Sequence, residues 1–236
     1  MNKIYEGKAK ILFQGEKENE IIIHYKDDAT AFNGEKKTQI SNKGLINNKI
    51  TEYIYLHLQK NGIKTHFIKR IDERKQLCKK VKIIPLEVIV RNIAAGSFSK
   101  RYGIEEGKKL TQRTLEISYK DDDLGDPLLN DYHAISLELV SREQLDIIYQ
   151  DVSKINEILI ELYESIGIEL VDFKAEYGID EQGEIILADE LSPDTSRLWD
   201  KKTNKKLDKD RFRRDMGDVV EAYKEIEKRL GVQCGS

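Results

Sequence analysis

Two carboxylates, Glu176 and Asp189, stand on either side of a short turn and could together hold a hard cation. Residues 170–178 and 184–190 both have the apolar alternation of strands, and Gln182-Gly183 between them is typical of a hairpin turn. A two-residue loop would put Glu176 directly opposite Asp189, and a four-residue loop would make them diagonal neighbours. A three-residue loop would instead put the two acids on opposite faces of the hairpin.

Like charges that face each other destabilise a sheet, so a paired arrangement needs compensation. Mg²⁺ prefers carboxylate oxygens and would supply it. The alternative is a solvated hairpin whose acids point into water, and the neighbouring residues weigh against it. Asp172, Lys174 and Glu176 alternate with apolar residues, which predicts one charged face over a packed one. The loop that follows Asp189 carries Arg197, a fork of donors suited to phosphate or carboxylate.

The N-terminal segment offers a second set of charges. Gly7 lets the backbone approach a phosphate closely, and Lys8 and Lys10 point the same way if the segment is extended. The segment is not a Walker A loop, because the second glycine and the Lys-Ser/Thr ending are missing. Taken alone, the signal is weak and is better explained by a solvated charged terminus. Together with a carboxylate pair for Mg²⁺, it predicts half of a nucleoside triphosphate site.

Residues 91–101 form a third constellation. Arg91 is followed by the small residues 94–96, which leave backbone amides uncovered, and Ser97 can begin a short helix. A phosphate at such a helix N-terminus would collect backbone donors, the Ser97 hydroxyl and the Arg91 guanidinium. A tight strand-to-helix turn with Arg91 in a surface ion pair is the alternative.

Composition limits the class of protein. The chain has 236 residues and a net charge of −3, with 40 basic and 43 acidic residues, and a dedicated nucleic-acid binder should show a basic surplus. Cys78 and Cys234 are too few and too far apart for a disulfide framework or a zinc site, which favours reduced thiols. Met1 leads into a charged segment, and no run of eighteen apolar residues occurs. We therefore expect a soluble cytoplasmic protein with no membrane partner.

The element pattern predicts an α+β fold. Residues 10–14 and 20–25 are predicted strands, and a helix is expected to follow Ser41 and stop at residues 61–62. Strands are expected on both sides of Pro85, which makes that proline a hinge or edge position between two lobes. A long helix should start at the capping pair Ser141 and Gln144 and close at residue 167. One last helix is expected over residues 212–230.

At this point the sequence resembles the SAICAR synthetase family. Residues 84–97 and 170–178 match its two signatures. Five further segments fit in the same order: residues 5–10, 104–107, 189–194, 196–200 and 208–213. The resemblance covers nearly the whole chain. Departures are small: Ala175 and Tyr177 affect packing, Thr195 replaces a frequent glycine, and Asn33 stands where some members carry Asp, so it is not assigned to the site.

The resemblance implies a two-lobed α+β, ATP-grasp/kinase-like fold with ATP between the lobes. Residues 1–84 would form the N-terminal β-rich lobe and residues 85–236 the C-terminal lobe. The implied reaction joins 5-amino-1-(5-phosphoribosyl)imidazole-4-carboxylate (the ribotide) to L-aspartate, with ATP and Mg²⁺ as cofactors, in purine synthesis. A homodimer without nucleic-acid partners is implied as well. A small-metabolite kinase and a non-catalytic nucleotide-binding module are the rival classes.

The resemblance also implies roles for individual residues. Asp172 and Lys174 would act in catalysis, and Glu176 and Asp189 would hold Mg²⁺. ATP contacts would come from Lys8, Ala9, Lys10, Lys79, Val81 and Glu87, with residues 84–87 lining the adenine slot. The ribotide and aspartate would contact Arg91, Ser97, Lys120, Asp126, Asp194, Arg197, Asp210 and Arg213. The acidic run 121–123 is either part of this site or a solvated loop.

Overall fold

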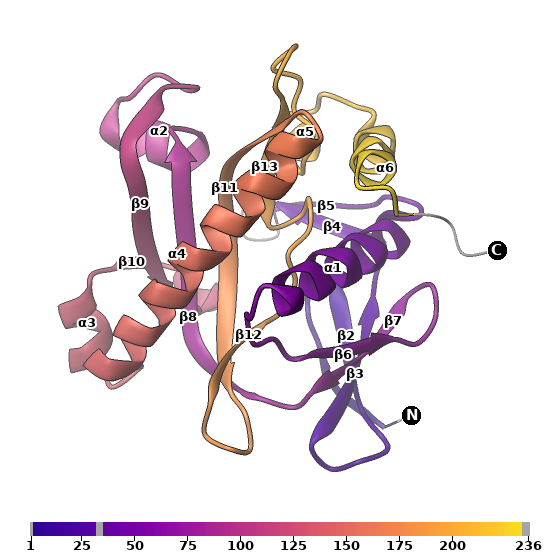
Figure 1. Cartoon of the computed structure of the whole chain (residues 1–236), viewed down its shortest axis with the longest axis vertical. Helices are drawn as coiled ribbons and strands as arrows, with labels where there is room; N and C mark the ends of the chain where they lie inside the picture. The colour runs from indigo at the N-terminus through magenta and orange to yellow at the C-terminus, as the bar shows by residue number, and fades with distance from the viewer. Residues whose placement is uncertain (1, 32–34, 233–236) are drawn as a thin grey trace.

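The fold was analysed in a computed structural model that describes residues 2–31 and 35–232. Asn33 and Cys234 lie outside the described residues. Two sheets dominate the arrangement, one built from residues 3–79 and the other from residues 82–200 (Figure 1). The predicted α+β class is confirmed. The change of sheet between residues 79 and 82 lies close to the proposed lobe boundary at residue 84, and that boundary itself stays a prediction.

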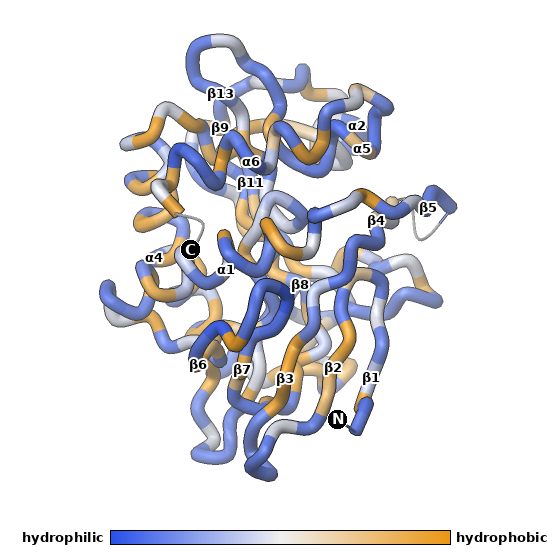
Figure 2. The backbone as a smooth tube through the Cα atoms, turned by 90° about the vertical axis from the view of Figure 1, so that its right-hand side faces the viewer, coloured by the Kyte–Doolittle hydropathy of each residue, from blue (hydrophilic) through white to orange (hydrophobic). Residues whose placement is uncertain are grey.

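The first sheet has five strands in the order β1-β2-β3-β7-β6. They are β1 (Lys3–Glu6), β2 (Lys10–Gln14), β3 (Glu20–Tyr25), β6 (Phe67–Arg70) and β7 (Lys75–Lys79). Strands β2 and β3 have the predicted bounds, because the turn between them separates two apolar runs. These runs appear as the hydrophobic stretches of the two strands in Figure 2.

The second sheet has the order β10-β9-β8-β11-β12, with β13 also paired to β11. Its strands are β8 (Lys82–Ile93), β9 (Lys109–Tyr119), β10 (Leu128–Leu129), β11 (Ile168–Ile179), β12 (Ile185–Ala188) and β13 (Ser196–Asp200). Pro85 lies inside β8 rather than between two strands. The register with β11 shifts there, from the Glu87–Glu176 pair to the Ile83–Gly178 pair, and a bulge of this kind accommodates a proline.

The β11–β12 turn has three loop residues, so the expected facing of Glu176 and Asp189 is wrong. Glu176 pairs with Ala188, and Asp180 pairs with Glu184 through a backbone hydrogen bond of 3.0 Å. The Asp180 carboxylate accepts hydrogen bonds from the backbone N–H groups of Gln182 and Glu184, both at 3.0 Å. With Gly183 at φ 81°, the turn is the three-residue type in which a left-handed glycine forms a bulge.

The helices cover the sheets and hold them together. Helix α1 (Lys43–Lys60) and the long α4 (Arg142–Ser165) appear where they were predicted, and Ser141 and Gln144 form the expected capping box. The last helix is divided into α5 (Asp210–Arg213) and α6 (Val219–Arg229), which corrects the single helix expected there. Between the two helices, Asp215, Gly217 and Asp218 have positive φ. A right-handed α-helix cannot continue through residues with this backbone conformation.

The remaining elements are short. They are the hairpin β4 (Asp28–Ala31) and β5 (Lys36–Gln39), the helices α2 (Gly96–Tyr102) and α3 (Asp131–Ser136), and the 3₁₀ turn η1 (Asp122–Leu124). One large apolar core joins α1, α4 and α6 to the second sheet, with Ile50, Leu159 and Tyr223 fully buried. Across residues 2–31 and 35–232, no helix combines the length and apolarity that crossing a bilayer would require.

Candidate active site

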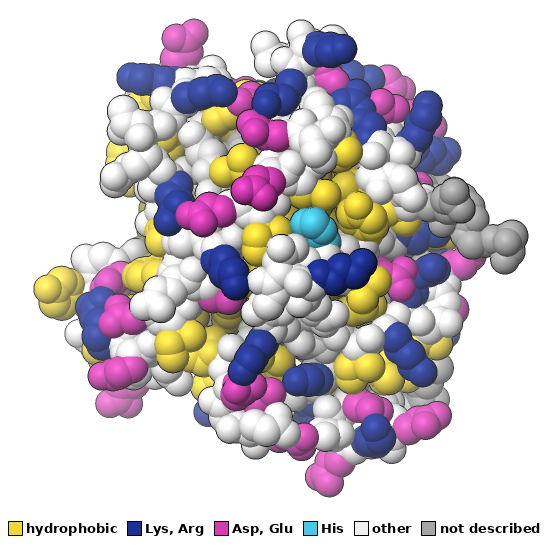
Figure 3. Space-filling view, in the orientation of Figure 1, with side chains coloured by type: hydrophobic (Ala, Val, Ile, Leu, Met, Phe, Trp, Pro, Cys, Tyr) yellow, Lys and Arg dark blue, Asp and Glu magenta, His cyan; other side chains and the backbone are white. Residues whose placement is uncertain are grey.

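A cavity of about 680 Å³ lies between the two sheets. Its apolar part is lined by Leu12, Ile21, Ile23, Val81 and Ile83. Its cationic side chains are Lys8, Lys10, Lys120, Lys174, Lys209 and Arg213. Its acidic side chains are Glu87, Asp122, Asp126, Glu176, Asp189, Glu190 and Asp194. On the face seen in Figure 3, acidic and basic side chains are interspersed, as they are in this cavity.

The N-terminal lysines reach this cavity from opposite ends of the turn before β2. Lys8 is half-exposed, and its ammonium lies 2.7 Å from Asp122 in η1. Lys10 is buried and forms ion pairs with Asp189 and, at 2.8 Å, with Glu190. The acidic run 121–123 therefore contributes Asp122 to the cavity and is more than a solvated loop. Ala9 lines the cavity between the two lysines.

Lys174 and Glu176 lie on β11 with the cross-strand partner Glu87 on β8. Lys174 Nζ donates to Glu87 at 2.6 Å and to Glu176 at 2.8 Å, and Lys120 Nζ donates to Glu176 at 3.0 Å. Burial lowers the pKa of Lys174, but Glu176 and Glu87 raise it more, so the pKa lies above its ordinary value. The lysine is therefore a fixed cation, not a proton acceptor.

Asp189 joins Glu176 in the cavity through its backbone conformation. The residue follows the end of β12 and has φ 60°, outside the pleat that would have sent its side chain to the other face. Burial raises the pKa of its carboxyl, but the nearby Lys10 and Lys174 outweigh it, and the pKa lies well below its usual range. Both predicted metal ligands thus line one cavity, although the register placing them there differs from the expected one.

His66 also lines the cavity and was not assigned to it from the sequence. Its Nε2 lies 3.1 Å from the carbonyl oxygen of Asp189. Burial lowers the pKa of the imidazole to about 4, so the ring is neutral at physiological pH. Because a lone histidine has no spacing signature, only the bridge between Thr65 and Leu187 brings it here.

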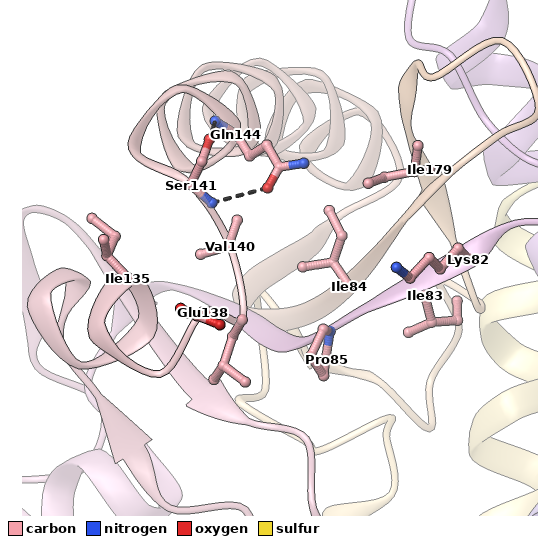
Figure 4. Close-up of a pocket in the computed structure, with 11 residues that line it drawn as sticks. Lys82, Ile83, Ile84, Pro85, Ile135, Glu138, Val140, Ser141, Gln144 and Ile179 are labelled. Carbon is pink, nitrogen blue, oxygen red and sulfur yellow. Dashed lines mark hydrogen bonds between the residues drawn. The ribbon is translucent and has the colours of Figure 1, made fainter.

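Residues 84–87 were expected to line the adenine slot. Glu87 lines the cavity, and residues 84–86 do not. Ile84 and Pro85 point instead into a separate groove of about 440 Å³, together with Ile135 and Val140 (Figure 4). Ile83 lines both spaces. The expected adenine slot at residues 84–87 stays a prediction.

Lys79 and Val81 differ in position. Val81 lines the cavity and packs against Gly178, where any side chain at position 178 would overlap it. Lys79 is not among the lining residues, and its ammonium lies 3.6 Å from Asp180 in the hairpin turn. Its predicted contact with ATP stays a prediction.

Four of the predicted substrate residues lie in the cavity: Lys120, Asp126, Asp194 and Arg213. Asp194 is buried and accepts hydrogen bonds at 2.6 Å from both the Lys43 ammonium and the Tyr223 hydroxyl. Burial raises the pKa of the Asp194 carboxyl, but Lys43 and Lys209 outweigh burial, and the pKa lies well below its usual range. Lys43 on α1 carries no motif, and only its burial against Asp194 reveals its role.

The other four predicted substrate residues lie together around Asp172, which was predicted to be catalytic. We call this group the arginine network, and its members are Arg91, Ser97, Asp172, Arg197 and Asp210. These five residues are not among those lining the cavity. Asp172 Oδ2 accepts from Arg91 at 3.0 Å and from Arg197 at 2.8 Å. Arg91 also donates to Ser97 at 3.3 Å, and Arg197 to Asp210 at 2.9 Å. The polar face of β11 therefore divides: Lys174 and Glu176 face the cavity, and Asp172 anchors the network.

Gly96 allows the network to close. It has φ 55° at the start of α2, and a Cβ there would overlap the Arg197 guanidinium. The small residues at 94–96 thus admit an arginine side chain close to the backbone, next to the Ser97 hydroxyl. The predicted short helix is present as α2, beginning at Gly96.

The sheets and the cavity define a class: a two-lobed enzyme whose lysines and carboxylates lie where polyphosphate and metal chemistry would need them. The chain belongs to the SAICAR synthetase family, whose model matches residues 3–230. It is 57% identical over 230 residues to the phosphoribosylaminoimidazole-succinocarboxamide synthase of Clostridium perfringens, covering 98% of this chain and 97% of that one. It is 58% identical to that of Fusobacterium nucleatum, over 96% of both chains.

Solved structures agree. The synthase of Ehrlichia chaffeensis superposes with a TM-score of 0.97 at 47% identity, covering 99% of this chain and all of that one. A SAICAR synthetase solved in complex with ADP has a TM-score of 0.95 at 45% identity, covering 98% of this chain and 99% of that one. These likenesses extend over both sheets, so the family fold is present as a whole.

Proposed function

We propose that the chain catalyses the reaction named for its relatives: an ATP-dependent ligation of 5-amino-1-(5-phosphoribosyl)imidazole-4-carboxylate with L-aspartate, giving the succinocarboxamide, ADP and phosphate. The observation that carries the proposal is the cavity in which Lys10 and Lys174 lie against Asp189 and Glu176. This arrangement matches what phosphoryl transfer requires, cations for phosphates and carboxylates for a metal. The reaction is a step of purine biosynthesis.

ATP would bind in this cavity. A relative 45% identical to the chain was solved in complex with ADP. The apolar side chains of Val81 and Ile83 would take the adenine, with Lys8, Ala9 and Lys10 at the phosphates and Glu87 nearby. Lys79 lies outside the lining residues, and we place it at the entrance to the nucleotide site.

The donor set of the cavity fits Mg²⁺. Glu176 and Asp189 offer hard oxygen ligands, and Mg²⁺ in such enzymes is held by one or two carboxylates together with substrate phosphates. The lysines that now contact both acids would move to the phosphates when a metal binds. The ion would neutralise charge on the transferring phosphoryl group.

A carboxylate is a poor acceptor for an amine until one of its oxygens becomes a leaving group. Transfer of the terminal phosphoryl group of ATP to the ribotide carboxylate would form an acyl phosphate and ADP. Lys174 would stabilise the charge that develops on the transferring group, because its pKa keeps it cationic. Attack by the aspartate amine on the acyl carbon would then form the C–N bond and release phosphate.

The arginine network would bind the phosphate of the ribotide. Arginine forks suit phosphate oxygens, and Ser97 and the start of α2 add further donors. Asp172 and Asp210 would orient Arg91, Arg197 and Arg213 in their positions. Lys120, Asp126 and Asp194 lie on the cavity side, where the reacting carboxylate and the aspartate would meet.

The test is ADP release with Mg·ATP, the ribotide and L-aspartate, leaving out each component in turn. We expect release to require all three and the succinocarboxamide to form. Release without aspartate would favour a small-metabolite kinase, and no release with any mixture would contradict the proposal. Transfer of ¹⁸O from the ribotide carboxylate to inorganic phosphate tests the acyl phosphate, and its absence would exclude that route.

We also propose that the chain acts in the cytoplasm as a homodimer. Tyr132 and Leu137, around α3, are exposed apolar side chains that a second copy could cover. Sedimentation equilibrium of the purified chain measures its oligomeric state directly. A monomer at micromolar concentration would contradict the dimer without affecting the proposed reaction.

A further inference from the structure

Lys209 differs from the other lysines that line the cavity. Lys8, Lys10, Lys120 and Lys174 each have a carboxylate oxygen within 3.0 Å of the ammonium. The nearest carboxylate oxygen to Lys209 Nζ, on Asp194, is 3.9 Å away. Among the described residues, nothing accepts a hydrogen bond from this ammonium, although the side chain is only 15% exposed.

Both oxygens of Asp194 are already engaged by other donors. One of its oxygens accepts from Lys43 and the other from the Tyr223 hydroxyl, both at 2.6 Å. The Lys209 backbone is fixed by a hydrogen bond from its N–H to the carbonyl of Pro193 at 3.1 Å, just before α5. The side chain is therefore held at the cavity wall with its nitrogen free to contact a bound molecule.

The charges around Lys209 disfavour its protonated form. Burial lowers the pKa of its ammonium, Arg213 on α5 and Lys43 on α1 lower it further, and Asp194 and Glu190 only partly compensate. Asp208 and Asp210, its sequence neighbours, are turned away, and their carboxylates accept from the backbone of Leu198 and from Arg197. The pKa of Lys209 therefore lies below its ordinary value, whereas that of Lys174 lies above its own.

We propose that Lys209 is the general base that takes a proton from the amino group of L-aspartate before the amine attacks. This inference rests on the proposed function. Aspartate enters with its amino group largely protonated, and an ammonium has no electron pair with which to attack. The neutral form of Lys209, on the cavity wall and 3.9 Å from the nearest carboxylate oxygen, can accept that proton.

The step balances in atoms and electrons. Neutral Lys209 takes one proton from the aspartate ammonium, whose freed electron pair forms the new C–N bond at the acyl carbon. The C–O bond to phosphate breaks with its electron pair, and phosphate leaves. The adduct nitrogen gives up its second proton to the departing phosphate, and Lys209 returns its proton to solvent through the open cavity.

Other acids and bases of the site are less suitable. Asp172 is held by two arginines, and Asp194 by Lys43 and Tyr223. Lys174 is held as a cation by Glu87 and Glu176. His66, a neutral ring, already uses its Nε2 at the carbonyl of Asp189. Of the described side chains in the cavity, Lys209 best combines a free nitrogen with a lowered pKa.

The test compares two amines as acceptors for the same acyl phosphate. Hydroxylamine is already neutral at pH 7 and needs no base, whereas aspartate does. In Lys209→Ala we expect aspartate-dependent turnover to fall roughly 10²–10⁴-fold, the usual contribution of a general base. Ribotide-dependent ADP release with hydroxylamine should stay within a few-fold of the original chain.

Lys209→Arg separates a base from a binding cation, because arginine keeps the charge but does not give up its proton. We expect the arginine variant to be as defective with aspartate as Lys209→Ala, and both to lose the rise of kcat with pH that Lys209 confers. Lys205→Ala, in the exposed loop before α5, is the matched control and should resemble the original chain.

Three results would overturn the inference. Activity of Lys209→Arg close to the original would make the residue a binding cation. Equal losses with aspartate and hydroxylamine would place it in the first half-reaction or in folding. A raised KM for aspartate at unchanged kcat would make it a binding group. Failure of the original chain to release ADP with ribotide and either amine would instead contradict the proposed function.

Discussion

The cavity and the arginine network use the same kinds of residues in two different ways. In the cavity, the charged groups come from several elements, and the half-exposed ammonium groups of Lys8 and Lys120 retain contact with open space. In the network, Arg91 and Asp172 are 3% and 4% exposed, and each makes more than one charged hydrogen bond. The first region is organised around open space, and in the second the arginines are held in place by buried carboxylates.

The difference shows that two clusters of similar charged residues can contribute very differently to the stability of the fold. A buried charge network is costly to interrupt, because the partner that remains is left unpaired in a low-dielectric interior. Half-exposed ion pairs contribute little to folding. Mutations of the half-exposed cavity lysines Lys8 and Lys120 should therefore change stability little, and mutations in the network should alter both turnover and stability.

Among the acids of the proposed metal site, the largest expected effect on turnover is that of Glu176→Gln. Glutamine keeps an oxygen that Lys120 and Lys174 can contact, but it removes the charge that a metal needs. We expect kcat to fall about 10²–10³-fold, equivalent to several kcal/mol of transition-state stabilisation. ADP release measures this, and urea unfolding measures the loss of stability that removing a buried charge also brings.

Glu181→Gln, in the exposed turn of the same hairpin, is the matched control and should leave kcat unchanged. A Glu176→Gln variant of normal activity would remove the acid from the metal site and leave it a role in folding alone.

Arg91→Ala should have the largest effect on stability. It leaves Glu116 and Asp172 without one of their partners in the interior. We expect the free energy of unfolding to fall by about 3–5 kcal/mol, measured by urea denaturation. Lys8→Ala should leave the unfolding free energy within about 0.5 kcal/mol, because its ion pair with Asp122 is solvated. Similar losses for both variants would erase the distinction between the regions.

Gly96→Ala tests the network from the backbone. Alanine at φ 55° is strained, and its Cβ would overlap the Arg197 guanidinium. We expect about 1–3 kcal/mol of lost stability, together with a raised KM for the ribotide as Arg197 is displaced. Gly103→Ala, which has φ 64° and no atom within 4 Å, carries the backbone strain without the overlap. An equal KM effect in both variants would make strain, not the arginine, the cause.

The last prediction concerns pH. Burial and the neighbouring Asp210 raise the pKa of Asp208 to about 7. Burial also raises the pKa of Asp210, but Arg197 and Arg213 outweigh it and lower that pKa to about 2. A raised folded-state pKa contributes stability below the unfolded value of 3.8, and this contribution is lost as pH rises toward 7. We expect unfolding free energies to fall by about 1 kcal/mol per pH unit in that window.

Asp208→Asn should remove this fall of the unfolding free energy with rising pH. The separate loss of stability below pH 3.8, caused by protonation of Asp210, should remain. Urea denaturation at several pH values measures both. An unchanged slope in the asparagine variant would assign it to another group.

Local signals were sufficient for much of the fold. Strands β2 and β3 and helices α1 and α4 follow from apolar periodicity and from the Ser141–Gln144 cap, which act within a few residues. The division of the last helix was missed, because apolar spacing continues across positions 216–220 while the backbone there turns left-handed. Hydrophobic periodicity does not report a break of that kind.

The sequence by itself determined that Asp172, Lys174 and Glu176 share a strand face, since side chains alternate along any strand. It also determined the family and therefore the acids and arginines that matter. Tertiary structure alone decided that this face divides between a cavity and a buried network. It also brought Asp189 into the cavity through a left-handed backbone, and left Lys209 beside an aspartate already satisfied by Lys43 and Tyr223. These outcomes depend on contacts between residues far apart in the chain, which no local spacing encodes.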